Sequence, residues 1–176
     1  WNLTNQKPEK RALQADPKEG ERWLNEEWPK IKIHAKRWQA MIYFIDESGV
    51  SLIPVMGKTW APKVKTPIVK VTGNKGGFCV TSAISPAGRM LFRVEKETVD
   101  SDVHIQFLKQ ILNHHPRRKI IVVEDNAPPH TSNKVKQFIV ENNKRFALYY
   151  LPPYSPNLNP DEGVWNRLKN NKLKAH

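Results

Sequence analysis

Three acidic residues of this sequence stand where a rigid element is expected to end or begin. Asp46 follows the apolar run 41–45, and Asp125 follows the run 120–124. Glu162 stands at the end of a proline-rich stretch, in the first turn of an expected helix. Carboxylates in such places can hold Mg²⁺ over a phosphodiester, because this ion prefers hard oxygen ligands. Two such ions can activate the attacking oxygen and stabilise the leaving oxygen of an in-line displacement.

Each of these acids also has a purely structural interpretation. An acid after a strand is often a turn residue or a helix cap. Asn159, Pro160 and Glu162 form the pattern of a capping box, in which Glu162 would bond back to the cap. Asp161 competes with Glu162 as the third acid, although it points roughly 100° away around the helix.

The histidines give weaker signals. His130, five positions after Asp125, could orient a metal ligand, contact a phosphate or cap the next helix. We expect it, together with Asn126, to support the acids rather than to bind metal. His104, His114 and His115 lie on or after a predicted helix, and the sequence favours solvated positions for them. The chain shows no pattern for a Ser-His-Asp or Cys-His nucleophile, and no glycine loop followed by Lys-Ser/Thr.

Composition points to a phosphate-rich partner. The chain has 176 residues, which suits one domain or one domain plus a short appendage, and its formal net charge is +12. A pI near 9.9 favours nucleic acid as the partner, although a ribosomal or other basic protein would share it. The single cysteine, Cys79, excludes an internal disulfide and a cysteine-rich zinc site, and favours a reducing compartment. No segment approaches the ~20 apolar residues that span a bilayer.

The expected elements form a mixed sheet flanked by helices. After a polar segment 1–15, an amphipathic helix is predicted from Asp16 to about Arg37. The sequence then predicts a hairpin of strands 41–45 and 50–55 and a second hairpin of strands 78–84 and 90–94. Helices starting at Ser101, at Thr131 or Ser132 and at Pro160 alternate with strands 120–124 and 146–151, which predicts an α/β fold.

The segment 57–77 differs from its surroundings, because it is rich in lysine and has no acid. We interpret it as a protruding basic loop with a short strand near 68–71. Its candidate phosphate contacts are Lys58, Lys63, Lys65, Lys70 and Lys75, and Trp60 could stack or pack. A merely solvated loop is the alternative.

Taken together, three motifs resemble a known family. They are Tyr43-Phe44-Ile45-Asp46-Glu47-Ser48, the run 122–130 that contains Asp125-Asn126-Ala127-Pro128-Pro129-His130, and Tyr154-Ser155-Pro156-Asn157-Leu158-Asn159-Pro160-Asp161-Glu162-Gly163-Val164-Trp165. In this order they resemble the DDE catalytic domain of mariner-type transposases, in particular the bacterial insertion-sequence branch. The segment 57–62 also resembles that branch, and the similarity covers residues 41–173.

This resemblance implies an RNase H-like (retroviral-integrase-like) fold with a five-stranded mixed sheet. It implies that Asp46, Asp125 and Glu162 are the catalytic acids and hold two Mg²⁺ ions, with Mn²⁺ as a substitute. It also implies DNA strand cleavage followed by 3′-hydroxyl strand transfer, in cut-and-paste transposition. The implied partners are double-stranded DNA, as transposon ends and a TA-containing target, and a second copy of the chain in a homodimer.

The same resemblance implies the organisation of the chain. Transposases of this kind carry helix-turn-helix modules ahead of the catalytic domain, and the chain begins at Trp1. We therefore expect residues 1–38 to be the linker and helix that follow a missing DNA-binding region, and residues 39–176 to be the catalytic domain. The expected location is the bacterial cytoplasm, in association with the nucleoid. The alternatives are an assembly module with an inactive RNase H-like fold, or another nuclease of that fold.

Overall fold

The computed structural model describes residues 16–52, 55–56, 60–65, 68, 76–96, 98–169 and 174–175. The helices are α1 (Pro17–Arg22), the π-helix η1 (Trp23–Glu27), α2 (Trp28–Trp38), α3 (Ser101–His114), α4 (Asn133–Glu141), the 3₁₀-helix η2 (Pro156–Leu158) and α5 (Asp161–Arg167). The strands are β1 (Met41–Ser51), β2 (Val55–Met56), β3 (Gly77–Ile84), β4 (Met90–Glu95), β5 (Ile120–Glu124), β6 (Phe146–Tyr150) and β7 (Lys174–Ala175). None of the helices in these ranges has the length and apolar character needed to cross a membrane.

Five strands form one mixed sheet, as the family resemblance implies, and their order is β4-β3-β1-β5-β6. Strands β4, β3 and β1 pair antiparallel, whereas β1, β5 and β6 run parallel. Parallel neighbours have their carboxyl ends at the same edge of a sheet. The residues that follow β5 and β6 therefore meet at one edge, beside the middle of the long strand β1.

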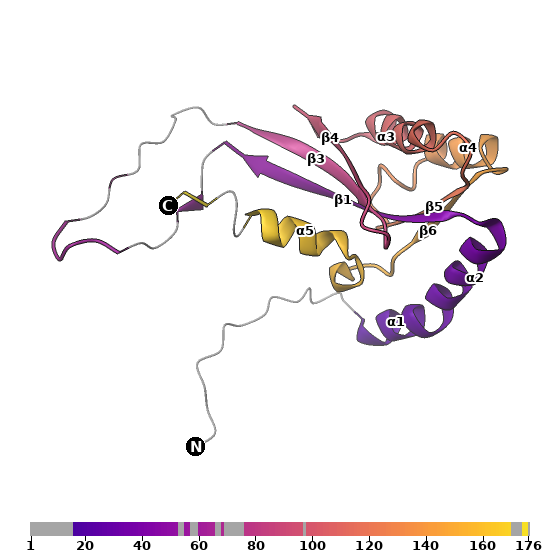
Figure 1. The fold of residues 1–176 in the computed structure, drawn as a ribbon, viewed down its shortest axis with the longest axis horizontal. Helices are drawn as coiled ribbons and strands as arrows, with labels where there is room; N and C mark the ends of the chain where they lie inside the picture. Colours follow the sequence, from indigo (N-terminus) through magenta and orange to yellow (C-terminus); the bar gives the residue numbers. More distant parts are fainter. Residues whose placement is uncertain are drawn as a thin grey trace, which may run out of the picture.

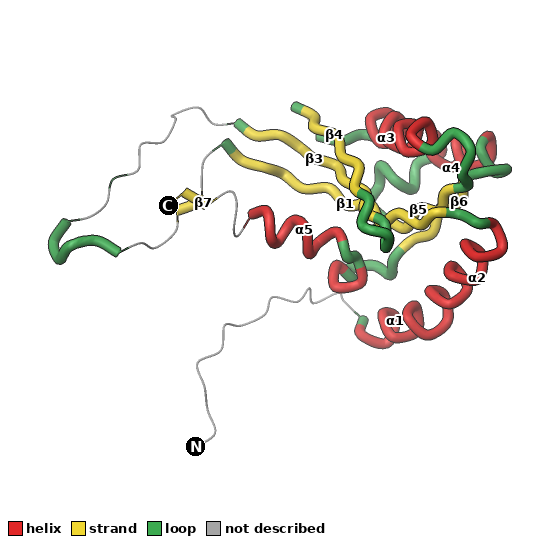
Figure 2. Tube along the Cα trace, viewed as in Figure 1, coloured by secondary structure: helices red, strands yellow, loops and turns green. Residues whose placement is uncertain are grey.

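Helices cover both faces of this sheet (Figures 1 and 2). Helices α3 and α4 lie on one face, over a core that contains Tyr43, Phe107 and Phe146. Helices α1 and α2 cover the other face, where Trp23 and Ile31 pack with strand residues. Because side chains alternate along a strand, Phe44 and the next even-numbered residue of β1, Asp46, lie on this second face.

The N-terminal helix begins as predicted. Asp16 is the N-cap, its side chain accepts a hydrogen bond from the Lys18 amide at 2.9 Å, and Pro17 is the first helical residue. The π-helical turn places Trp23 and Trp28 in a stack with ring centroids 5.9 Å apart. The indole of Trp23 then donates to the Tyr150 carbonyl at 3.0 Å, which fastens this helix to the end of β6.

The first predicted hairpin is wrong. Segment 47–49 does not turn, because β1 continues to Ser51 as one strand of 11 residues. Its partner over this length is β3, in which Cys79 lies opposite Gly49 and Thr81 opposite Glu47. Asp46 thus lies within a strand rather than at its end. The second predicted hairpin is correct, and its turn has Gly88 at φ +76°.

Two helix starts differ from the expected ones by a single position. Asp100, not Ser101, caps α3, and its carboxylate accepts from the amides of Asp102 and Val103 at 2.9 Å. At α5, Pro160 occupies the cap position without a side-chain bond of its own.

Candidate active site

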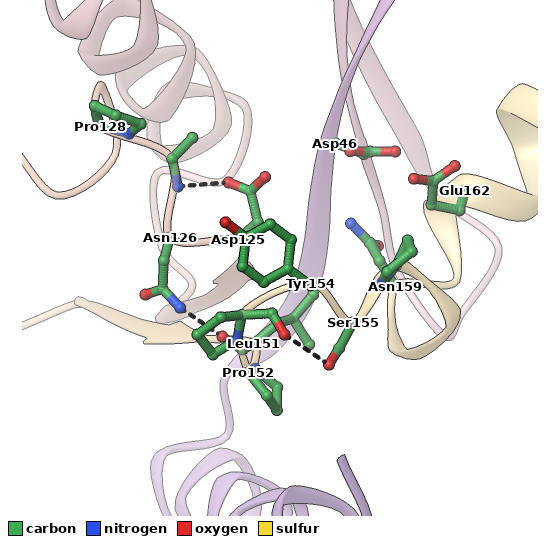
Figure 3. A pocket seen from close by; sticks show the side chains of 13 residues that line it. Asp46, Asp125, Asn126, Pro128, Leu151, Pro152, Tyr154, Ser155, Asn159 and Glu162 are labelled. Carbon is green, nitrogen blue, oxygen red and sulfur yellow. Dashed lines mark hydrogen bonds between the residues drawn. The ribbon is translucent and has the colours of Figure 1, made fainter. Parts of the chain in front are cut away.

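The three predicted acids line one cleft of about 420 Å³. Asp46 comes from β1, Asp125 follows β5, and Glu162 stands in the first turn of α5. The rest of the lining comes from the segments after β5 and β6: Asn126, Ala127, Pro128, Leu151, Pro152, Pro153, Tyr154, Ser155, Pro156 and Asn159. Figure 3 shows the carboxylates of Asp46 and Glu162 directed toward each other, with Asp125 across the cleft.

Like charges act on one another in this cleft. The pKa of Asp46 is raised from 3.8 to about 7, first by burial and then by the neighbouring carboxylate of Glu162, with smaller effects of Asp161 and Asp125. Such convergence of carboxylates is costly without a cation, and it is typical of sites that bind one. The donor atoms are all carboxylate oxygens, which suits Mg²⁺ or Mn²⁺. The side chains therefore fit a divalent metal, although their oxygens are not all within 4.8 Å of one another.

Asp125 is held by hydrogen bonds from its own loop. Its Oδ1 atom accepts from the Ala127 amide at 3.0 Å and from Nδ1 of His130 at 2.7 Å. The bond from His130 is the main reason why the pKa of Asp125 is lowered. Burial opposes protonation of His130, but its bonds to Asp125 and Glu47 outweigh burial and raise its pKa to about 11. His130 is thus an imidazolium that holds Asp125 ionised and in place.

Behind His130 lies a buried group that the sequence did not predict. The ring of His104 packs against that of His130, tilted by 33°, with centroids 4.3 Å apart. Nε2 of His104 lies 3.3 Å from Oε2 of Glu124, and both side chains are fully buried. His104, expected to be solvated, therefore belongs to the core, and so does His115, whereas His114 is exposed. The sequence signal for His104 was its place among Ile105, Leu108 and Ile111 on the inner side of the helix.

Glu47, His104 and His130 also form a compact group, with one ligand atom from each within 4.8 Å of the others. Nε2 of His130 lies 3.3 Å from Oε1 of Glu47. One nitrogen of His130 thus faces Glu47 and the other faces Asp125. The contact with Glu47 orients the ring of His130, and the ring in turn orients the Asp125 carboxylate. Glu47 was not among the residues selected from the sequence.

The start of α5 separates two adjacent acids. Asp161 is fully buried, and the Ser82 hydroxyl donates to its Oδ2 atom at 2.6 Å. Burial raises the pKa of Asp161 to about 6, against the effect of this bond. Glu162, the next residue, lines the cleft instead. The selection of Glu162 over Asp161 as the third acid stays a prediction.

Asn159 and Asn126 fix the segments that carry the acids. Asn159 Oδ1 accepts from the Asp161 amide at 3.1 Å, while its Nδ2 donates to the Ile45 carbonyl at 2.8 Å. This joins the start of α5 to β1 beside Asp46. Asn126 Nδ2 donates to the Leu151 carbonyl at 2.7 Å and joins the loop after β5 to the end of β6 (Figure 3).

An exposed aromatic residue stands in the lining of the cleft. Tyr154 has a positive φ of 53°, which is uncommon for a residue other than glycine, and 58% of its surface is exposed. Figure 3 places its ring in front of Asp125. The sequence motif contained Tyr154 but gave no reason to assign it to the site.

The predicted basic loop lies largely outside the described residues. Lys58, Lys70 and Lys75 are not among them. Lys63 and Lys65 are described and exposed, and Trp60 is 99% exposed. Trp60, Lys63 and Lys65 do not line the cleft.

Comparison with known proteins gives consistent results. Residues 41–176 match the family described as DDE superfamily endonuclease. The chain is 26% identical over 136 residues to the insertion element IS630 uncharacterized 39 kDa protein of Shigella sonnei, covering 77% of this chain and 39% of that protein. It is 30% identical over 122 residues to the transposable element Tcb1 transposase of Caenorhabditis briggsae, covering 65% of this chain and 42% of that protein. The chain thus spans about two fifths of the length of these relatives.

The fold is that of a solved transposase. The crystal structure of the Mos1 mariner paired end complex with Mn superposes with a TM-score of 0.72 at 18% identity, covering 100% of this chain and 55% of that one. This similarity and the sheet order confirm the RNase H-like fold expected from the sequence.

Proposed function

Because the chain belongs to the DDE superfamily of endonucleases, we propose that it is the catalytic part of a DNA transposase. It cleaves DNA strands at transposon ends and joins the freed 3′-hydroxyl to target DNA. The observation that carries this proposal is the meeting of Asp46, Asp125 and Glu162 in one cleft, although they come from three separate elements. Both reactions are in-line displacements at phosphorus and differ only in the nucleophile, so that one site can serve both.

The three acids would hold divalent metal, with Mg²⁺ as the natural ion and Mn²⁺ as its substitute. The solved Mos1 complex named above contains Mn, which supports this assignment. When bound, a pair of such ions would stabilise charge on the attacking and leaving oxygens. The protein's part is to keep the ligands ionised and placed: His130 fixes the Asp125 carboxylate, and Asn159 fixes the start of α5.

The partners follow from the same proposal. The substrate is double-stranded DNA, first a transposon end and then a TA-containing target, and the active complex is a homodimer that brings two ends together. The similarity to a paired end complex of Mos1 supports the pairing. Work on chromosomal DNA would place the protein with the bacterial nucleoid.

The central test is strand cleavage by variants of the acids. We expect Asp46→Asn, Asp125→Asn and Glu162→Gln each to lower Mg²⁺- or Mn²⁺-dependent nicking of end DNA at least ~10³-fold, because each removes a charged ligand. DNA binding measured in parallel should remain within about twofold. Asp161→Asn is the matched control, since an amide oxygen can still accept from Ser82, and it should retain most activity.

Three results would contradict this proposal. Undiminished cleavage in an acid variant would remove that residue from the site. A wild-type chain that binds DNA but does not cleave it with either metal would favour the inactive assembly module. Cleavage that shows no preference for a transposon end and no joining would favour another nuclease of this fold.

The basic loop is proposed as a DNA contact. Lys63 and Lys65 are exposed and lie in the described part of the loop. Each phosphate contact adds about 0.9 to the slope of log affinity against log salt. We expect Lys63→Ala/Lys65→Ala to reduce this slope by up to about 2 in a fluorescence anisotropy titration. An unchanged slope would show that neither side chain touches a phosphate.

A further inference from the structure

The amino ends of the three parallel strands meet at the edge of the sheet opposite the cleft. The Met41 amide donates to the Lys119 carbonyl at 2.9 Å, and the Ile120 amide donates to the Arg145 carbonyl at 2.8 Å. These bonds bring together three segments that are far apart in sequence: the end of α2, the turn before β5 and the turn before β6. In Figure 1, α2 turns into β1 at the right of the molecule. At ~3.3 Å per residue, the start of β5 lies roughly 16 Å from Asp125 at its other end.

All three segments are basic. They carry seven cationic side chains: Lys36, Arg37, Arg117, Arg118, Lys119, Lys144 and Arg145. Residues 36–40, 116–119 and 142–146 contain no aspartate or glutamate. The nearest acid along the chain, Glu141, accepts a hydrogen bond from Gln137 at 2.8 Å. We name these seven residues the basic edge.

Part of this charge has a structural role. Arg145 donates to the carbonyls of Leu112, His115 and Pro116, and so closes the end of α3. Lys119 lies over the ring of Trp38, with Nζ 5.2 Å from the centroid. Lys36 and Arg37 belong to the last turn of α2, where cations offset the helix dipole.

The remaining charge has no such role. Arg117, Arg118 and Lys144 are exposed, and their side chains form no ion pair or hydrogen bond with other residues that the structure describes. Together with Lys36 and Arg37 they face solvent from three adjacent segments. Neighbouring strands are ~4.8 Å apart, so that the segments span roughly 10 Å. Several phosphates of a DNA duplex fall within that distance.

We propose that the basic edge is a second DNA-binding surface, which holds the phosphate backbone of a duplex on the side of the domain away from the cleft. The proposal rests on the proposed function, since that reaction involves two duplexes, an end and a target. A cleft that holds the scissile phosphate can position one of them. The basic edge would hold the other duplex, or a distant part of the same one, without reading its sequence.

The test compares two variants that remove the same charge. Arg117→Ala/Arg118→Ala/Lys144→Ala removes three side chains of the basic edge that make no internal bond. Lys18→Ala/Lys109→Ala/Lys136→Ala removes three exposed lysines from helices elsewhere. Binding to a 12-bp duplex without divalent metal is followed by anisotropy at several salt concentrations, and stoichiometry by sedimentation velocity. Melting curves by circular dichroism show that each variant is folded.

We expect the wild-type chain to bind two short duplexes and the basic-edge variant to bind one. The affinity of the basic-edge variant for a long duplex should be about tenfold lower or more. The slope of its log affinity against log salt concentration should be smaller by about 2 to 3. A variant with Arg117→Lys and Arg118→Lys keeps the positive charge and should bind DNA as the wild-type chain does. The control variant should keep two sites and lose much less affinity.

The outcomes separate this proposal from the proposed function. An equal loss in both variants, or one duplex bound by the wild-type chain, would overturn the second surface. So would unchanged DNA binding by the basic-edge variant, which would leave an acidic protein as the partner. The basic-edge variant should still cleave a short end duplex in Mn²⁺ at saturating DNA, at a rate within about twofold of the wild-type rate. Absence of cleavage in the wild-type chain would instead count against the proposed function.

Discussion

At the scale of single residues, the two aspartates of the cleft have pKa values that are shifted in opposite directions. Asp46 has a pKa near 7, whereas the bond from His130 lowers that of Asp125. The hydrogen bond from His130 therefore keeps Asp125 ionised, whereas burial and the Glu162 carboxylate disfavour the ionised form of Asp46, and we expect a bound cation to favour it. This difference between the two aspartates follows from what each touches, not from residue type.

The raised pKa of Asp46 gives a test in the metal-free protein. The folded state binds this proton more tightly than the unfolded state, in which the pKa is near 3.8. The stability that this provides is full below about pH 4 and is lost as pH rises to about 7. We expect Asp46→Asn to raise the melting temperature by about 2–4 °C at pH 8, on the order of 1 kcal/mol after solvent screening, and to leave it unchanged near pH 4.

Calorimetric scans at both pH values measure this effect. Adding Mn²⁺ at pH 8 should stabilise the wild-type chain and not the variant, because Asp46 is a proposed ligand. Equal melting temperatures at pH 8 would mean that Asp46 ionises freely in the fold.

At the scale of elements, Asn159 connects α5 with β1. Its side chain accepts from the Asp161 amide and donates to the Ile45 carbonyl, and it is 6% exposed. One residue thus bonds both the first residue of the helix that carries Glu162 and the strand that carries Asp46. The distance between two of the acids depends on this side chain.

We expect Asn159→Ala to lower the free energy of unfolding by about 1–3 kcal/mol, since it leaves buried groups unpaired. It should also raise the Mn²⁺ concentration needed for half-maximal cleavage. Asn159→Asp keeps the oxygen that accepts from the Asp161 amide but places a buried acceptor against the Ile45 carbonyl, so it should lower the free energy of unfolding as well as change the metal requirement. Asn157→Ala, at an exposed position in η2, is the control. A normal metal requirement in Asn159→Ala would show that α5 is positioned by other contacts.

At the scale of the whole molecule, the N-terminal helix shares a core with the sheet. Trp23, Ile31 and Ala35 pack with Phe44 and Val123. The sequence placed a boundary between residues 38 and 39, which stays a prediction. The packing indicates that residues beyond 39 need the helix in order to bury one face of the sheet.

A truncation tests this dependence. A chain that begins at residue 39 would expose much of that apolar face, and we expect it to aggregate or to lose cooperative unfolding. A chain that begins at Asp16 is the control and should unfold cooperatively. Size-exclusion chromatography and thermal melts measure both. A soluble, cooperative chain from residue 39 would support the predicted boundary.

Particular residues show how far the sequence could be followed. Runs such as 120–124 and the turn at Gly88 are local signals, and both were interpreted correctly. The length of β1 could not be predicted from the local sequence. Residues 47–49 are extended because they pair with β3, in which Cys79 lies opposite Gly49. In the same way, the burial of His104 against Glu124 depends on a helix meeting a strand. The three acids could be selected from motifs, whereas the bonds that hold them, such as Asn159 to Ile45, required coordinates.

The position of Asp46 within β1 has a mechanical consequence. It is flanked by paired residues, with β3 on one side and β5 alongside the preceding positions, and its neighbour Ile45 is tied to Asn159. Asp125 and Glu162, by contrast, stand on a loop and on a helix of 7 residues. Asp46 is thus held by strand pairing, and we expect any closure of the cleft to shift the loop and the helix that carry Asp125 and Glu162 rather than β1.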